Sequence, residues 1–219
     1  MSAAKEERTI IAGPAGDLEV VVRPAAAGGA LSERGSCALV CHPHPVFGGT
    51  MDNKVVTTLA RIYAELGVPA ARFNFRGVGA SGGQYDKGRG EVDDLAAVAD
   101  WLQQRTGASG LLLAGFSFGS GVASNGCLRM PGVRHGLFVA PPVGRYNFAA
   151  VTSYPCPLSV VVAGQDELVD SAQILVWAKT LDPAPQLVEL PEASHFFHGQ
   201  LAVLRERLLA LLPQQLAEP

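Results

Sequence analysis

The chain has 219 residues, of which 48% are hydrophobic and 17% are charged, and its formal net charge at pH 7 is −3. A nucleic-acid-binding protein usually has a basic patch and a high isoelectric point, so an isoelectric point of about 5.9 argues against that class. At this length we expect one domain, residues 1–219, large enough to bury a core without a metal or disulfide.

The mean hydropathy of +0.21 raises the question of a membrane segment. The longest apolar run, residues 111–123, is broken by several Gly and Ser residues. It is shorter than the roughly 18 apolar residues that a spanning helix needs. The first eight residues also lack the apolar stretch of a secretory signal. We therefore expect no membrane partner and a cytoplasmic protein.

The four cysteines do not have the spacing of a disulfide framework or a metal site. Cys37 and Cys41 lie in one apolar run, and in a strand they are about 13 Å apart. A disulfide requires Cα atoms within about 7 Å. Reduced thiols in the cytoplasm are the simpler interpretation.

Short apolar runs bounded by Gly or Pro alternate along the chain with segments of helical periodicity. The runs predicted as strands are 9–12, 18–23, 37–41, 70–75, 110–114, 135–139, 158–163 and 186–190. The segments predicted as helices are 53–66, 91–105, 117–129, 171–181 and 199–212. This alternation predicts an α/β fold with a mostly parallel central sheet and helices on both faces. Runs 111–114 and 158–163 are almost continuously apolar, as is typical of strands covered on both faces.

The N-terminal edge of the sheet is expected to be antiparallel. Runs 9–12 and 18–23 are separated by Gly-Pro-Ala-Gly, which indicates a hairpin. Ligands of such sheets bind at the carboxyl ends of the parallel strands. The loops that follow the strands are therefore the places to look for a site.

The pentapeptide Gly115-Phe-Ser117-Phe-Gly119 follows one predicted strand and precedes a predicted helix. A G-x-S-x-G motif at such a junction is typical of a nucleophile elbow, in which a sharp turn exposes the serine. The start of the helix offers N–H groups and a partial positive charge for a developing oxyanion. The alternative is a glycine-rich turn with an incidental serine. We predict Ser117 as the nucleophile.

A serine nucleophile needs a base, and the base needs an orienting carboxylate. In the elbow class the acid and then the histidine follow the serine along the chain. Asp166 comes directly after strand 158–163 and is the predicted acid, whereas Asp170 is more simply a helix N-cap. His195, in the loop after the last strand, is the predicted base; His198 lies where the final helix begins.

The oxyanion hole needs two backbone donors. One is the N–H of Phe118, the residue after the nucleophile. The other is expected from the loop His42-Pro-His44-Pro-Val46, where the prolines have no N–H to offer. His44 is the first candidate and Val46 the second. The alternative for this loop is a metal site made by Cys41, His42 and His44, but no compact set of further ligands completes it, so no metal is predicted.

A literal G-x-G-x-x-G occurs at Gly77, Gly79 and Gly82. A dinucleotide site also requires a helix that opens on the glycines and an acidic residue about 20 positions further, at the end of the next strand. Here the loop continues, so no cofactor is predicted. Arg76 is interpreted as a structural arginine that binds a carboxylate or main-chain carbonyls.

At these residues the sequence resembles the α/β-hydrolase superfamily over nearly its whole length, and most of all the small lidless bacterial serine hydrolases related to carboxylesterases and dienelactone hydrolases. The matching motifs are the His42–Pro45 stretch, residues 76–82, the Ser117 elbow, Asp166 in Gly-x-Asp and His195 in Ser-His-Phe-Phe. Pro43 replaces the glycine of the family's His-Gly-x-Pro loop. Because dienelactone hydrolases use a cysteine nucleophile, Ser117 favours ordinary esters.

The resemblance implies a cap inserted after the sixth strand, yet only residues 140–157 separate two predicted strands there, and the chain leaves no room for a lid. We expect a shallow, open pocket lined by Phe47, Val143, Tyr146 and Phe196. Phe116, Phe118 and Phe197 lie nearby, and core packing is an equal alternative for Phe116 and Phe118. The predicted function is hydrolysis of small or short-chain carboxylic esters through an acyl-enzyme. A thioesterase, a peptidase or a non-catalytic binding scaffold is the alternative.

Overall fold

The computed structural model describes residues 5–216. Residues 1–4, which belong to the segment predicted to lack a secretory signal, lie outside the described part of the chain, as do residues 217–219. The strands are β1 (Glu7–Ile11), β2 (Leu18–Arg23), β3 (Ser36–Cys41), β4 (Ala70–Phe73), β5 (Gly110–Phe116), β6 (Val133–Val139), β7 (Leu158–Ala163) and β8 (Gln186–Leu190). The helices are α1 (Lys54–Glu65), α2 (Gly90–Thr106), α3 (Phe118–Arg129), α4 (Ser171–Ala178) and α5 (Leu201–Gln215), with short 3-10 turns η1 (Ser32–Arg34), η2 (Pro45–Phe47) and η3 (Phe148–Ala150).

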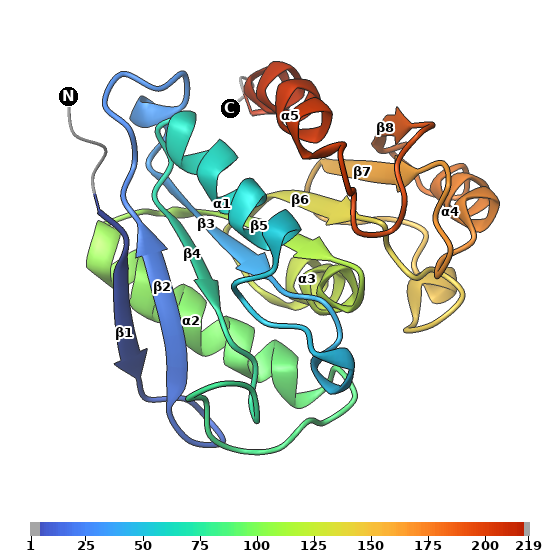
Figure 1. The fold of residues 1–219 in the computed structure, drawn as a ribbon. Coiled ribbons are helices and arrows are strands. Elements are labelled where there is room, and N and C mark those ends of the chain that lie inside the picture. Colours follow the sequence, from blue (N-terminus) through green and yellow to red (C-terminus); the bar gives the residue numbers. More distant parts are fainter. Residues whose placement is uncertain (1–4, 217–219) are drawn as a thin grey trace.

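All eight strands form one twisted sheet in the order β1-β2-β4-β3-β5-β6-β7-β8 (Figure 1). Neighbours from β4 to β8 pair in parallel, whereas β2 is antiparallel to both β1 and β4. The predicted α/β class, the mostly parallel sheet and the antiparallel N-terminal edge are therefore confirmed. Each predicted strand and helix is present, with ends that differ by a few residues.

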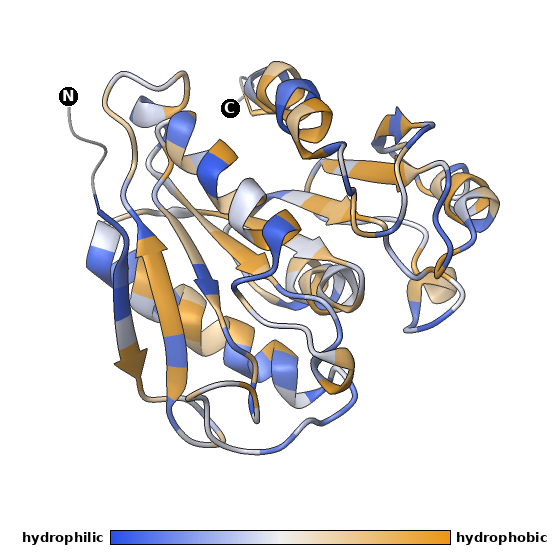
Figure 2. Cartoon of the chain, in the orientation of Figure 1, coloured by the Kyte–Doolittle hydropathy of each residue, from blue (hydrophilic) through white to orange (hydrophobic). Residues whose placement is uncertain are grey.

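The central strands separate two hydrophobic cores, which explains their continuous apolar sequence. Along β3, Cys37 and Leu39 face one core and Ala38 and Val40 face the other, because successive side chains of a strand alternate. One core includes buried residues of α2, α3 and α4, and the other includes those of α1 and α5. Figure 2 shows the hydrophobic colouring concentrated on the central strands and on the helix faces turned toward them.

In the described part of the chain, no cap domain covers the sheet edge formed by the carboxyl ends of the parallel strands. Between β6 and β7, residues 140–157 contain η3 as their only regular element. Within residues 5–216, no helix combines the length and the apolar character needed to cross a membrane. The four cysteines are buried and unpaired.

Candidate active site

Ser117 lies in the turn between β5 and α3, and its backbone is strained. Its φ of 53° and ψ of −119° are unusual for a residue with a side chain. The Ser117 N–H donates to the carbonyl of Val139 at 2.9 Å, and this bond holds the turn against β6. A Cβ at Gly115 would collide with the carbonyl of Gly119, and one at Gly119 with the carbonyl of Cys41. Both glycines of the motif are therefore required for this turn.

The structure brings His195 and Asp166 to this serine. His195 Nε2 lies 3.1 Å from Ser117 Oγ, and His195 Nδ1 lies 2.7 Å from Asp166 Oδ2. The Asp166 side chain is fully buried and that of His195 is 2% exposed. Because Asp166 accepts a hydrogen bond from Nδ1–H, Nε2 of the ring is the nitrogen that can accept one from the serine hydroxyl. Loops after β5, β7 and β8 supply the three residues, so all come from the carboxyl edge of the sheet.

The loop after β7 orients the acid and also anchors the base. Asp166 Oδ1 accepts the backbone N–H groups of Leu168 at 2.9 Å and Val169 at 2.8 Å, which leaves Oδ2 for the histidine. The backbone N–H of His195 donates to Glu167 Oε2 at 3.0 Å. This bond is the largest influence that lowers the pKa of Glu167. Sequence reasoning missed Glu167, and its one available signal was a second carboxylate beside the predicted acid.

The two residues that the sequence ranked behind Asp166 and His195 lie outside this group. Asp170 is the N-cap of α4, because its Oδ1 accepts the N–H groups of Ala172 and Gln173. His198 is exposed in the turn before α5. Arg76 also has its predicted role, since its guanidinium binds both oxygens of the buried Asp94 at 3.0 and 2.8 Å.

His42 fixes the start of the loop that follows β3. Its Nε2 accepts the N–H of Phe75 at 3.1 Å, and its Nδ1 donates to the carbonyl of Pro43 at 2.6 Å. Burial lowers the pKa of His42 to about 4, so the ring is neutral at pH 7. Because both ring nitrogens are occupied, His42 has none left for a metal ion. Within the described residues, no group of three or more His, Cys, Asp or Glu is placed to hold one.

The same loop places His44 next to the start of α3. Val46, the second candidate for an oxyanion donor, donates its backbone N–H to His44 Nδ1 at 3.2 Å. This N–H is therefore already hydrogen-bonded. The His44 ring packs 5.0 Å from that of Phe118, and its Nε2 lies 3.1 Å from the hydroxyl of Tyr85. The N–H of Phe118 is in the first turn of α3, where N–H groups lack an intrahelical acceptor.

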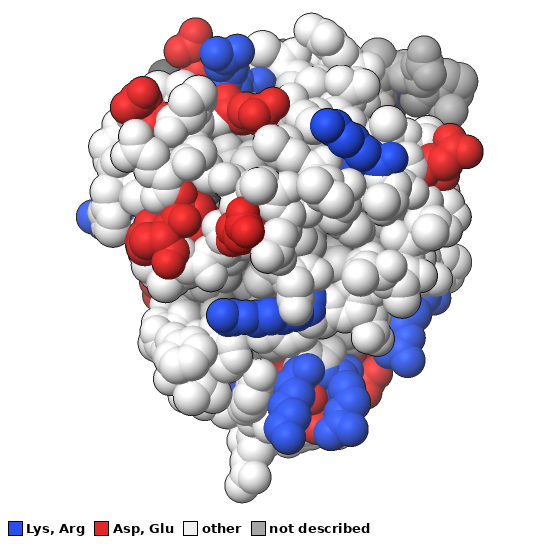
Figure 3. Space-filling view, turned by 90° about the vertical axis from the view of Figure 1, so that its right-hand side faces the viewer, with Lys and Arg blue, Asp and Glu red and all other residues white. Residues whose placement is uncertain are grey.

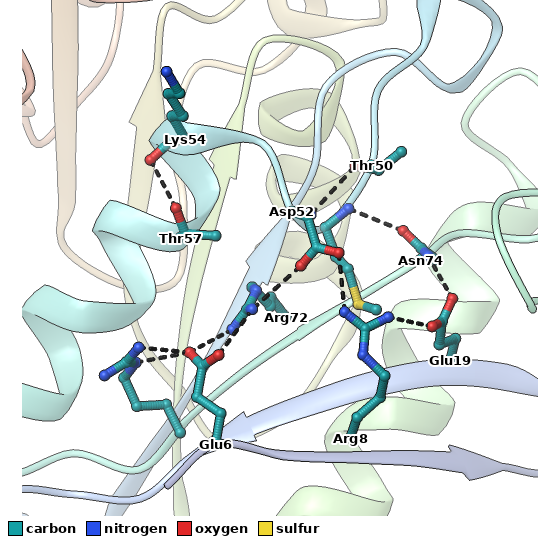
Figure 4. A network of polar contacts seen from close by, with 11 residues as sticks. Glu6, Arg8, Glu19, Thr50, Asp52, Lys54, Thr57, Arg72 and Asn74 are labelled. Carbon is teal, nitrogen blue, oxygen red and sulfur yellow. Dashed lines mark hydrogen bonds and ion pairs between the residues drawn. The ribbon is translucent and has the colours of Figure 1, made fainter. Parts of the chain in front are cut away.

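A polar network holds the far end of this loop to the antiparallel edge of the sheet (Figure 4). Met51 donates its backbone N–H to Asn74 Oδ1 at 2.9 Å, and Asn74 Nδ2 donates to Glu19 at 2.7 Å. Asp52 binds Arg8 at 2.9 Å and Arg72 at 3.3 Å. The segment between His42 and α1 is thereby anchored at both ends.

A pocket of about 350 Å³ opens beside the serine. Its lining includes Ser117, His195, His44, Phe47, Phe118, Tyr146 and Phe196. The prediction of Val143 as a lining residue was wrong. After Pro141 and Pro142 the chain turns, with the Val143 N–H bonded to the Pro141 carbonyl, and the Val143 side chain is buried in the core shared with α3 and α4.

Of the other phenylalanines near the site, Phe116 and Phe197 are fully buried in the opposite core. Phe116 packs behind His195, with ring centroids 5.1 Å apart. A larger hollow of about 730 Å³ lies at the opposite edge, where Ser36 and Val133 begin their strands. Among the described residues that line it, none is a histidine or an aspartate.

A parallel sheet with a serine elbow, a histidine and an aspartate at its carboxyl edge is the arrangement of α/β serine hydrolases. An alpha-beta serine hydrolase homologue from Coxiella burnetii is 43% identical, with a TM-score of 0.88 over 94% of this chain and 97% of that one. An a/b serine hydrolase without lid from Xanthomonas campestris is 38% identical, with a TM-score of 0.89 over 98% and 97%. The chain belongs to the α/β-hydrolase superfamily.

The comparison with curated proteins covers a smaller part of the chain. An uncharacterized protein from Rickettsia prowazekii is 40% identical over 149 residues, which are 66% of this chain and 63% of that protein. The chain thus spans less than two thirds of the length of the curated relatives that it matches. No protein-family model matches the chain.

Proposed function

We propose that this protein is a metal-independent serine esterase that cleaves small or short-chain carboxylic esters through an acyl-enzyme. The observation that carries the proposal is the Ser117–His195–Asp166 arrangement, with 3.1 Å from Ser117 Oγ to His195 Nε2 and 2.7 Å from His195 Nδ1 to Asp166. The likeness to serine hydrolases supports it.

In this mechanism Ser117 Oγ attacks the ester carbonyl while His195 Nε2 takes the hydroxyl proton. The tetrahedral intermediate collapses, the C–O bond to the alcohol breaks, and His195 returns the proton to the leaving oxygen. A water molecule, deprotonated by His195, then attacks the acyl-Ser117 carbonyl. The second tetrahedral intermediate collapses, the C–O bond to Ser117 Oγ breaks, and His195 returns the proton to Oγ as the acid is released. Asp166 holds the ring in the required tautomer and stabilises its protonated form.

The backbone N–H groups of Phe118 and His44 are the proposed oxyanion donors. Three facts support His44. The flanking prolines have no N–H, and the Val46 N–H already donates to the His44 ring. The His44 and Phe118 rings are also in contact. Loss of one such donor typically costs about 10²–10³ in kcat. The placement of this loop therefore contributes to the rate in addition to the three side chains.

The size of the pocket favours a small acyl group. Its volume of about 350 Å³ is at the lower end of the range for ligand sites, roughly 300–1,000 Å³. Phe47, which is 82% exposed, and Phe196, which is 37% exposed, line an open mouth, and no cap covers a long chain.

The experiment is labelling with a fluorophosphonate probe, with Ser117→Ala as the control. We expect labelling of the wild type and none of the variant, whereas labelling that persists in Ser117→Ala, or is absent from both, would refute the proposal. A series of p-nitrophenyl esters then tests the acyl length: activity should peak at short chains, and a peak at long chains would contradict the open pocket.

The same three residues also serve thioesterases and peptidases, which stay alternatives to ester hydrolysis. Matched acetyl esters, thioesters and p-nitroanilides compared at one acyl group decide between them. We further propose a reducing compartment such as the cytoplasm, on the ground that all four buried cysteines are unpaired.

A further inference from the structure

The pocket beside Ser117 contains one basic side chain, and its charge is not balanced within the pocket. Among the described residues that line it, Arg145 is the only Lys or Arg, and none is Asp or Glu. Arg145 lies in the loop after β6, next to Tyr146. A positive charge is therefore placed at the site where an ester would bind.

The Arg145 guanidinium is not used by the fold. Arg72, Arg76 and Arg205 each bind a carboxylate, but the Arg145 side chain makes no hydrogen bond or ion pair with any residue in 5–216. Its backbone is fixed, because its N–H donates to the Pro142 carbonyl at 2.8 Å. A guanidinium has five N–H donors and a planar edge that fits a carboxylate. The side chain is thus free to bind such a group.

The positive charge of Arg145 affects His44, a residue of the same pocket. The pKa of His44 is lowered, first by burial and second by the positive charge of Arg145. His44 packs on Phe118, the residue after the nucleophile. The positive potential of Arg145 therefore reaches the part of the pocket where the ester carbonyl would lie.

The neighbouring surface has the same sign of charge. A second hollow of about 340 Å³ shares Phe118 and Tyr146 with the pocket, and is lined by Lys87, Arg89 and Arg129. Asp86 pairs with Arg89 at 2.9 Å and offsets one of these charges. On the face seen in Figure 3, several Lys and Arg side chains gather toward the lower edge, whereas most Asp and Glu side chains lie higher. Such a surface attracts anionic ligands.

We propose that Arg145 is a specificity-determining residue, and that the preferred substrates are small esters carrying a second group that is a carboxylate. The apolar part of such an ester would pack against Phe47 and Phe196 while the carboxylate pairs with the guanidinium. The inference depends on the proposed esterase function, since it names the class of ester that the same site takes.

Two pairs of rigid substrates test this, because in each pair a carboxylate is exchanged for a neutral amide of the same shape. 4-Acetoxybenzoate and 4-acetoxybenzamide place the charge on the alcohol side, and the phenyl esters of 4-carboxybenzoic and 4-carbamoylbenzoic acid place it on the acyl side. The para geometry prevents intramolecular attack by the carboxylate. At about 0.15 M salt, where the Debye length is about 8 Å, we expect kcat/KM to favour the anionic member of at least one pair by about three- to tenfold.

Arg145→Gln should abolish this preference, so that the ratio of kcat/KM between the two members of each pair falls to about one. The matched control is Arg129→Gln, which removes the same charge from the neighbouring hollow and should keep the preference. Equal rates within both wild-type pairs, or a preference that survives in Arg145→Gln, would overturn the inference while leaving the esterase intact. If no ester is hydrolysed in a Ser117-dependent manner, the proposed function itself fails.

Discussion

The backbone N–H of His195 donates to Glu167 Oε2 at 3.0 Å, so the proposed base is tied to the loop after β7 through its main chain as well as its ring. Asp166 and Glu167 are consecutive, and together they bind the ring and the backbone of one histidine. The pair therefore limits both the rotation of the imidazole and the movement of the loop that carries it.

This relationship makes Glu167 a positioning residue. Glu167→Ala should lower kcat for a short-chain ester by about three- to tenfold with little change in KM, because small displacements of a catalytic group are costly. Glu167→Gln keeps an oxygen acceptor and should recover most of the loss. The control is Glu192→Ala, an exposed carboxylate of the same region that does not bind His195. Equal kcat values for Glu167→Ala and the control would contradict the assignment.

Asp166 and Asp170 form a matched pair for substitution. Asp166→Asn should lower kcat by about 10³–10⁴, because an amide at this position favours the wrong histidine tautomer. Asp170→Asn should change neither activity nor stability, since Asn caps a helix as well as Asp. Steady-state kinetics and thermal unfolding of both variants check this. A large loss of activity in Asp170→Asn, with Asp166→Asn active, would reverse the assignment.

The glycines of α3 differ in what surrounds them. Gly119→Ala should reduce the free energy of unfolding by about 1–3 kcal/mol, because its Cβ meets the main-chain carbonyls of Cys41 and His42. The atoms nearest a Cβ at Gly121 belong to the Tyr146 side chain, at 3.3 Å, and alanine adds helix propensity, so Gly121→Ala should lose less stability than Gly119→Ala. Urea unfolding distinguishes them, and equal stability of the two variants would show that the turn is not close-packed.

Two buried histidines make the stability depend on pH. Burial lowers the pKa of both His42 and His135 from 6.5 to about 4. Between these values the unfolded chain binds more protons than the folded one, so stability is full above pH 6.5 and falls as the pH drops toward 4. Each histidine contributes a slope of up to about 1.4 kcal/mol per pH unit in that window.

Urea unfolding at pH 7, 6 and 5 measures this slope. His135→Gln should reduce it by about one histidine's contribution, whereas His198→Gln, an exposed residue, should leave it unchanged. The same slope in the wild type and in His135→Gln would mean that His135 is not buried in its neutral form.

The catalytic candidates themselves were within reach of the sequence because their signals are local. Ser117 is marked by two glycines between a strand and a helix, and Asp166 and His195 each follow a strand whose apolar pattern is plain. Since parallel strands end at the same edge, their following loops meet without further information. The alternation of strands and helices was enough to predict the two-sided sheet, and the Gly-Pro-Ala-Gly turn between the first two runs predicted its antiparallel edge.

The tertiary structure decided which loop atoms bind one another and which loop side chains turn into the core. Glu167 accepts the backbone N–H of His195, 28 positions away, and Val46 donates its backbone N–H to the His44 ring. Val143 turns into the core after two prolines. The position of Arg145 in the serine's pocket, where none of the described lining residues is Asp or Glu, likewise depends on the tertiary structure. Hydrophobic periodicity records which face of a strand or helix is buried. It carries no record of which loop atoms satisfy one another's hydrogen bonds, and only the assembled chain determines that.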